Sequence, residues 1–386
     1  MITAFLKNRS ALFSLATVVY ILLFVISLSL GHRETDEVVY QTLGMQLFLH
    51  HSYSLQGTDM LRFLPKAIYD TPIFFHPPVF PFILGLLYVV GGAYADFLIP
   101  PLIFVFITIF IYKLAFKISQ SETTAVKAYV LALFSPMLLL TATKLHLDLL
   151  MTLFIVLAFY FEAVSFETQK KKDIIFSGIC ITLALLTRYT AILAVPFLLF
   201  WAIQKRVEVK KIALFFLPMV VFGLWLLYFF AKQGFIGFTS TAPTAESILH
   251  YPFLYLTVKV RKWYFYFTSI FLVNPSLLFL FWYAKKSIYK KINFSVILFG
   301  AFALTLLVAM TIMGVAGYGF QMRYIVAVEP FLLIIIAMLP IEKNKSVSFL
   351  LLLFLVHNVL LFFYNGIIFQ SADMTSFLER LVYHLH

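Results

Sequence analysis

The sequence predicts an all-α polytopic membrane protein, a bundle of about 11 transmembrane helices with a surface helix in its first outer loop. Of the 386 residues, 62% are hydrophobic and only 12% are charged, and the mean hydropathy is +0.98. These values lie far from the averages of soluble domains. Apolar runs of spanning length recur along the chain, and each must be helical in a bilayer, where backbone groups find no other hydrogen-bond partners.

Short polar segments separate the expected spans. These spans cover residues 11–30, 94–117, 125–142, 146–165, 173–187, 189–204, 211–231, 263–284, 293–315, 323–340 and 347–369. A further run, 77–93, opens with Pro77-Pro78 and ends at Gly91-Gly92, which favours an interfacial or re-entrant helix over a crossing. If this run does cross, the chain has one more span. We expect one transmembrane domain over residues 1–386 and no separate soluble domain.

Basic residues indicate which loops face the cytoplasm. Because such residues gather in cytoplasmic loops, the N-terminus is predicted to lie inside and the outer face to carry residues 31–93, 143–147, 232–262 and 316–322. Most lysines and arginines stand in six short clusters, at 7–9, 113–127, 170–172, 205–211, 285–291 and 343–345. The outer loop 31–93 is expected to hold interfacial helices, with residues 36–51 forming the first of them.

The net charge of +12 does not indicate nucleic-acid binding, because the basic residues form short clusters between apolar runs rather than one continuous surface. The single cysteine, Cys180, excludes an intrachain disulfide framework and a cysteine metal site. The protein is therefore expected to work within a membrane. The polar residues described next are expected on its outer side.

Asp36 and Glu37 directly follow the first span. An acidic pair beside a membrane helix needs a function or a partner. A carboxylate here can accept the proton of an alcohol or amine that attacks a sugar. On its own, the pair favours a surface cap of the helix that follows, where acidic residues are preferred. Tyr40 lies on the same helical face as Asp36.

Two further polar groups are expected on the outer side. His76 precedes Pro77-Pro78, where it can meet a phosphate or a metal, although a histidine at a helix start is often structural. Lys144, His146 and Asp148 form the second group, at the outer end of two spans. Lys144 and Asp148 are four residues apart, and a plain ion pair explains them if this stretch is helical. Alternatively, Asp148 faces Asp36 across a cavity, with or without a divalent cation between them.

Two arginines interrupt the apolar pattern. Arg188 divides the stretch 174–201, and Arg323 with Tyr324 opens a late span. An arginine in such a position is costly without a fixed anionic partner, and a lipid phosphate matches a guanidinium geometrically. Snorkelling of both arginines to lipid headgroups is the alternative.

Taken in order, these motifs resemble those of the C-type glycosyltransferases (GT-C fold), in the branch of the protein O-mannosyltransferases and the bacterial transferase that adds aminoarabinose to lipid A. The resemblance covers residues 1–340 or so. It is carried by Asp36-Glu37-x-x-Tyr40, His76-Pro77-Pro78, Asp148, Leu186-Thr187-Arg188 and Arg323-Tyr324. Phe75 stands where some lipid A transferases have a metal-binding acidic residue. The sequence therefore establishes no cofactor, and a divalent cation stays open.

The resemblance implies an inverting transfer of a sugar from a polyprenyl-phosphate donor to a lipid, glycan or protein acceptor, on the outer face of the cell membrane. It implies Asp36, aided by Glu37, as the catalytic carboxylate. The donor phosphate is assigned to His76, Arg188, Arg323 and Tyr324, and the acceptor or a metal to Asp148, Lys144 and Tyr40.

A transporter or flippase for lipids or anionic solutes is the alternative function, since it uses the same buried arginines and aspartates. Such a transporter commonly has inverted repeats and charges near mid-span. Here we find no repeat, and the charged residues concentrate at the outer ends of the predicted helices.

Overall fold

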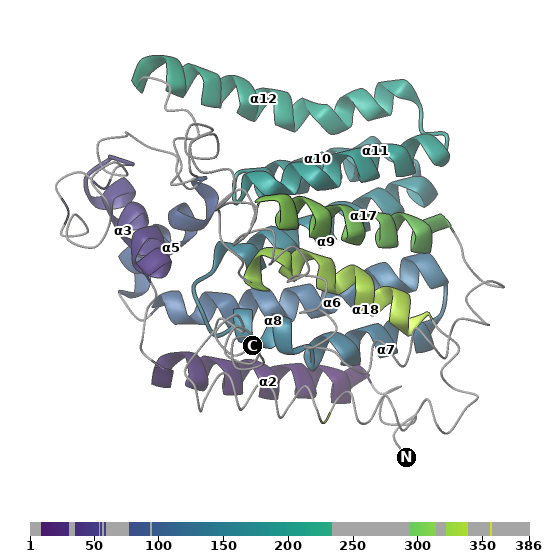
Figure 1. The fold of residues 1–386 in the computed structure, drawn as a ribbon, viewed down its shortest axis with the longest axis horizontal. Coiled ribbons are helices and arrows are strands. Elements are labelled where there is room, and N and C mark those ends of the chain that lie inside the picture. Colours follow the sequence, from purple (N-terminus) through teal and green to yellow (C-terminus); the bar gives the residue numbers. More distant parts are fainter. Residues whose placement is uncertain are drawn as a thin grey trace, which may run out of the picture.

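The computed structural model describes residues 9–30, 35–53, 55, 58, 77–92, 95–233, 294–313, 322–338 and 356, and every element within them is helical. Figure 1 shows most of these helices lying alongside one another, with α3 and α5 grouped at one end. The elements are α2 (Arg9–Leu30), α3 (Thr35–Leu49), α5 (Val79–Gly91), η2 (Ala95–Leu98), α6 (Ile99–Ser119), α7 (Glu122–Leu133), α8 (Pro136–Thr141), α9 (Leu147–Thr168), α10 (Lys171–Leu185), η3 (Tyr189–Ala194), α11 (Val195–Gln204), α12 (Val209–Gln233), α17 (Phe294–Met313), η7 (Met322–Val328) and α18 (Glu329–Ala337).

Three stretches are long and apolar enough to cross a membrane among the residues described: 95–119, 147–168 and 294–312. Their lengths of 25, 22 and 19 residues agree with three of the predicted spans. Several other predicted spans correspond to shorter or interrupted helices, so the predicted number of crossings is not confirmed. The predicted spans 263–284 and 347–369 fall outside the described residues, apart from residue 356.

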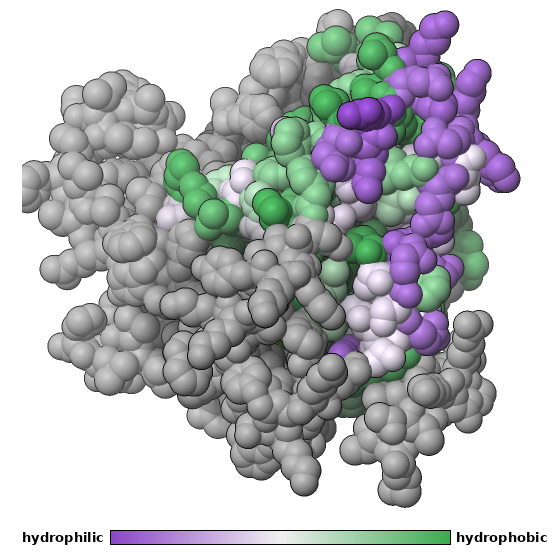
Figure 2. Space-filling view, turned by 90° about the vertical axis from the view of Figure 1, so that its right-hand side faces the viewer, coloured by the Kyte–Doolittle hydropathy of each residue, from purple (hydrophilic) through white to green (hydrophobic). Residues whose placement is uncertain are grey.

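The two ends of the bundle differ in polarity. At the right-hand end of Figure 1, basic residues stand at or beside the connections α9–α10 and α11–α12, including 170–172 and 205–206, and Lys117 lies in the last turn of α6. Figure 2 faces this end and shows hydrophilic side chains gathered over it. The connections at residues 142–146 and 186–188 lie at the opposite ends of α9 and α10. This arrangement separates the lysine-rich turns from the polar residues that the sequence assigns to the outer side.

One predicted span is broken. Residues 125–142 were expected to form one helix, but α7 ends at Leu133 and α8 begins at Pro136. A proline disfavours helical backbone at the preceding residue and suits the first position of a new helix. Ser135 occupies the break, where its hydroxyl accepts from Leu138 N (3.4 Å) and donates to Oε1 of the buried Glu329 (2.8 Å). The expectation of one continuous helix here is wrong.

Three of the helices in the described part of the chain begin with a turn of 3₁₀ helix. η2 leads into α6, η3 into α11 and η7 into α18, and each of the three α-helices has proline in its first turn. Proline is tolerated there because its missing N–H has no partner within the helix. These junctions place short irregular segments at the same end of the bundle as α3 and α5, where side chains can converge.

The run 77–93 forms α5, a helix of 13 residues. At 1.5 Å per residue it extends about 20 Å, which is short of the ~30 Å hydrocarbon core. α5 packs against α3 instead, and backbone meets backbone where they cross: a Cβ added to Gly85 would lie 2.3 Å from Gly44 O. Val79 N also donates to Leu186 O (3.0 Å), which ties the start of α5 to the end of α10.

Replacing Gly85 with alanine is expected to lower the free energy of unfolding by about 1–3 kcal/mol, because α3 and α5 must separate to admit the methyl group. Gly223→Ala is the matched control: no described atom lies within 4 Å of its added Cβ. Since alanine favours a helix over glycine by about 1 kcal/mol, the control is expected to be neutral or stabilising. Denaturation in one detergent measures both, and equal effects would contradict the close crossing.

The core of the bundle is aromatic and apolar. Phe331 of α18 packs edge-on against Phe159, Phe299 and Phe302, with ring centroids 4.9 to 5.0 Å apart.

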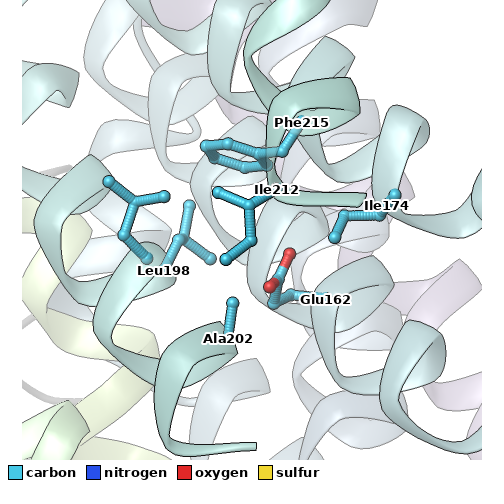
Figure 3. A pocket seen from close by; sticks show the side chains of 7 residues that line it. Glu162, Ile174, Leu198, Ala202, Ile212 and Phe215 are labelled. Carbon is cyan, nitrogen blue, oxygen red and sulfur yellow. The ribbon is translucent and has the colours of Figure 1, made fainter. Parts of the chain in front are cut away.

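The buried Glu162, in the second half of α9, lines a small pocket between α9, α10, α11 and α12 that is otherwise apolar (Figure 3). Glu162 lies 14 positions after Asp148, about 21 Å along the helix. It is therefore remote from the candidate site.

Candidate functional site

Four segments distant in sequence converge beside α3. They are the first turn of α3, the turn 142–146 with the first turn of α9, the junction between α10 and η3, and the start of η7. Each supplies polar side chains that were predicted to lie on the outer side: Asp36, Glu37 and Tyr40; Lys144, His146 and Asp148; Arg188; Arg323 and Tyr324. His76 falls outside the described residues, and its part in the site stays a prediction.

Arg323 joins two of these segments. Its Nη2 donates to Asp36 Oδ2 at 2.5 Å, and its Nη1 lies 2.5 Å from His146 Nδ1. Arg323 is only 9% exposed, whereas the Asp36 side chain is 39% exposed. A guanidinium can only donate, so the facing nitrogen of His146 must be unprotonated. Asp36 thus pairs with a buried cation while its own side chain stays partly exposed.

A second ion pair lies next to the first. Arg188 Nη1 donates to Asp148 Oδ1, and the Arg188 guanidinium stacks over the ring of Tyr324, 4.3 Å from its centroid. Tyr324 follows Arg323 in the chain, so η7 contributes to both pairs. The anionic partner predicted for Arg188 is therefore found in Asp148. Stacking on an aromatic face and pairing with a carboxylate both suit arginine better than lysine.

Tyr40 lies near both carboxylates, Asp36 and Asp148. It is 3% exposed and packs edge-on against Phe80 of α5, with ring centroids 5.6 Å apart. Burial raises the pKa of Tyr40 well above its usual range, and the negative charge of Asp36 raises it further. The phenol is therefore a neutral hydrogen-bond donor and acceptor at physiological pH.

Glu37 occupies a different environment from its neighbour Asp36. It is 2% exposed, and its Oε1 accepts from the backbone N–H of Leu145 at 3.2 Å. On the other side of the same turn, Ser27 of α2 donates to Thr143 O at 3.1 Å. The turn that carries Lys144 and His146 is thus bound by side chains of both α2 and α3.

Lys144 does not lie on a helix with Asp148. α9 begins at Leu147, so Lys144 belongs to the preceding turn, where it is buried. The four-residue helical spacing assumed from the sequence is therefore wrong, and Asp148 pairs with Arg188. The reason is local: His146 has extended backbone at the N-cap and ends the turn just before α9.

His146 is held in its neutral form. Burial lowers the pKa of His146 well below its usual range, and the cations of Arg323, Lys144 and Arg188 lower it further. A neutral imidazole can accept the hydrogen bond from Arg323, whereas an imidazolium would be repelled by it.

This environment predicts that the protein loses stability in mild acid. Because the unfolded histidine titrates near pH 6.5 and the folded one well below it, the unfolded state binds more protons as pH falls through about 6.5. The free energy of unfolding should then fall by up to about 1.4 kcal/mol per pH unit below that value. The free energy of unfolding, measured from pH 7.5 to 5 for the unchanged protein and for His146→Gln, tests this. The difference in free energy between the two proteins should become smaller as the pH falls. A difference that stays constant with pH would contradict the prediction.

One polar contact that supports the site was missed from the sequence. Gln41 Nε2 of α3 donates to Oδ2 of Asp96, a fully buried residue in η2, at 2.6 Å. Asp96 stands in the predicted span 94–117, and an acidic residue in an apolar run is a signal for a specific partner. Together with the crossing of α3 and α5, this bond fixes α3 relative to the start of α6.

Three charged residues of the site lie at helix starts. Asp36, Asp148 and Arg188 are at or next to the first turn of a helix, where backbone N–H groups have no partner within the helix and acidic side chains are favoured. Two arginines supply fixed cations there. Among the described residues there is no group of three or more His, Cys, Asp and Glu side chains arranged to hold a metal ion.

Known proteins resemble this chain in sequence or in fold. Residues 75–232 match the sequence family described as dolichyl-phosphate-mannose-protein mannosyltransferase. The fold matches that of ArnT from Cupriavidus metallidurans, a C-type glycosyltransferase. The TM-score is 0.63 against the structure bound to undecaprenyl phosphate and 0.56 against the apo structure, at 14% and 15% sequence identity.

The two ArnT matches cover 89% and 87% of this chain but only 62% and 60% of the ArnT chain, so this chain spans about three-fifths of their length. No curated protein matches it in sequence. The family match over residues 75–232 and the shared fold confirm that this integral membrane chain resembles the C-type glycosyltransferases of the protein O-mannosyltransferase and ArnT branch.

Proposed function

We propose that the protein is an inverting glycosyltransferase that moves a sugar from a polyprenyl-phosphate donor to an acceptor at the outer face of the membrane. The observation that carries this proposal is the pairing of Asp36 with Arg323 and of Asp148 with Arg188 at one end of the bundle. An ArnT structure of the same fold has undecaprenyl phosphate bound, which supports the same class of donor here.

Asp36 is the proposed base. It is the more accessible of the two adjacent acids, and a carboxylate at this place can take the proton of the acceptor hydroxyl or amine. The acceptor then attacks the anomeric carbon from the side opposite the phosphate. The bond from that carbon to the phosphate oxygen breaks, its electron pair leaves with the polyprenyl phosphate, and the proton remains on Asp36.

Arg188 and Arg323 are the proposed ligands of the departing phosphate, with Tyr324 orienting Arg188 and with His76 as a further predicted ligand. Guanidinium groups bind phosphate through paired hydrogen bonds. Both arginines already hold carboxylates in the described structure. In the proposed mechanism the arriving phosphate competes with Asp36 for Arg323 Nη2, and its binding there frees Asp36 to act as the base.

The same proposal includes the predicted topology. About 11 crossings, a cytoplasmic N-terminus and one transmembrane domain over residues 1–386 place the loop 31–93 and the site outside, where lipid-linked sugars of the cell envelope are used. The separation of the lysine-rich turns from the site along α9 and α10 supports this orientation. Asp148, Lys144 and Tyr40 border Asp36 and are the proposed acceptor side, where a divalent cation also stays a proposal.

Lipid and glycan analysis of cells tests this function. Cells that lack the gene should accumulate one sugar linked to polyprenyl phosphate and lose one glycosylated product, and mass spectrometry of both fractions identifies the sugar and the acceptor. Re-expression of the intact protein should reverse both changes. If the lipid-linked sugar instead appears on the wrong face of the membrane with its transfer intact, the protein is a flippase.

A further inference from the structure

The polar residues of the site form a closed circuit through three segments. Asp36 binds Arg323, and Arg323 contacts His146. Leu145, the residue before His146, donates its N–H to Glu37, the residue after Asp36. The circuit closes because Asp36 and Glu37 are neighbours in the chain, and so are Leu145 and His146. A shift of the turn 142–146 relative to α3 would therefore have to break one of the three contacts.

The two acids at the start of α3 serve different sides of this circuit. The Asp36 side chain is 39% exposed and faces the cation that we assign to the phosphate, whereas Glu37 is 2% exposed and accepts from a backbone amide. A general base must come within about 3 Å of the proton that it removes. An enclosed carboxylate that accepts from the main chain is poorly placed for that, but it is well placed to fix a turn.

We propose that Glu37 is a positioning residue, which acts by holding the Leu145 amide and thereby sets the place of His146 beside Arg323. It does not touch the reacting atoms. This inference rests on the proposed function, but the contact between Glu37 and the Leu145 amide can be tested without a substrate. Ser27 of α2 supports the same turn by donating to Thr143 O. The turn is therefore held at two points, Thr143 and Leu145.

The chemistry of Glu37 distinguishes this role from that of a base. Glutamine keeps a side-chain oxygen that can accept from Leu145 N but cannot take up a proton. Glu37→Gln should therefore retain the positioning contact, whereas Glu37→Ala should lose it. Misplacement of a catalytic group by about 1 Å can cost about 100-fold in rate.

Amide hydrogen exchange of the purified full chain tests the contact directly. In Glu37→Ala, the peptide containing Leu145 should exchange at least about tenfold faster than in the unchanged protein, since the amide loses a buried acceptor. In Glu37→Gln, the exchange rate of the same peptide should stay within about threefold of its rate in the unchanged protein. Glu208→Gln, an exposed acid in the lysine-rich turn before α12, is the control for loss of a carboxylate and should change nothing. Unchanged exchange in Glu37→Ala would overturn the proposal, whether or not the protein transfers sugar.

Sugar transfer from the donor lipid identified in the cell experiment gives the second measurement. Glu37→Ala should lower kcat by about 10- to 100-fold, and Glu37→Gln should restore it to within about threefold of the unchanged protein, with the same pH profile. If Glu37→Gln is as inactive as Glu37→Ala, Glu37 is a base and the proposal fails. If the unchanged protein transfers no sugar, the proposed function fails, and the exchange experiment still decides the role of Glu37.

Discussion

Replacing Asp36 with asparagine is expected to lower the rate of sugar transfer by about 10³-fold or more and, at the same time, to tighten binding of polyprenyl phosphate. The rate falls because asparagine cannot accept the proton of the acceptor. Binding tightens because Asp36 Oδ2 occupies Arg323 Nη2 at 2.5 Å, and removing that negative charge leaves the guanidinium to the phosphate. A change of about tenfold in affinity, or 1.4 kcal/mol, is the expected scale.

Titration of the purified protein and of Asp36→Asn with undecaprenyl phosphate in one detergent measures the affinity, and transfer from the identified donor lipid measures the rate. Glu208→Gln, far from the site in the lysine-rich turn, should change neither. Wild-type transfer by Asp36→Asn would show that Asp36 is not the base. Weaker lipid binding by the same variant would show that Asp36 does not compete with the phosphate for Arg323.

Replacing Arg188 with methionine is the second large change, and it is expected to act on stability as well as on transfer. Asp148 is 2% exposed and pairs with Arg188, so the variant leaves a buried carboxylate without its partner. Breaking a buried ion pair from one side costs about 3–5 kcal/mol. The variant also loses the stacking of the guanidinium on Tyr324 and one of the two proposed phosphate ligands.

A double variant separates these two effects. Adding Asp148→Asn to Arg188→Met removes the unpaired charge, so most of the lost stability should return, while transfer should stay low because no cation replaces Arg188. The free energies of unfolding of Arg188→Met, Asp148→Asn and the double variant, measured by titration with a denaturing detergent, give the coupling between the two residues. Additive losses in the double variant would contradict the ion pair, and recovered transfer would contradict the phosphate role.

Part of the fold was predictable because it follows from solvation alone. A chain this apolar can satisfy its backbone in a bilayer only through helices, and every regular element among the described residues is helical. Pro77, Pro78 and Gly91 marked the ends of α5, and the structure has a helix of 13 residues between them. The break at Ser135 and Pro136 carried an equally local signal, but the apolar pattern on both sides concealed it.

The candidate site was predictable as a set of residues but not as a set of contacts. Charges near membrane spans are costly, which is why Asp36, Asp148, Arg188 and Arg323 stood out in the sequence. Their pairing depends on how α3, α9, η3 and η7 pack, and the sequence order does not specify that. The helical pair of Lys144 with Asp148 was wrong for this reason, because a turn ends before α9 begins.

The sequence by itself determined that the chain lies in a membrane, that its helices are separated by basic turns, and which polar residues gather at the opposite end. These follow from the cost of burying charge and backbone groups in lipid, which acts on each segment separately. Only the tertiary structure decided that Arg323 joins Asp36 to His146, that Arg188 joins Asp148 to Tyr324, and that Glu37 faces a backbone amide while Asp36 does not. Such contacts join residues up to 287 positions apart, and the close packing of helices, rather than any local preference, brings them together.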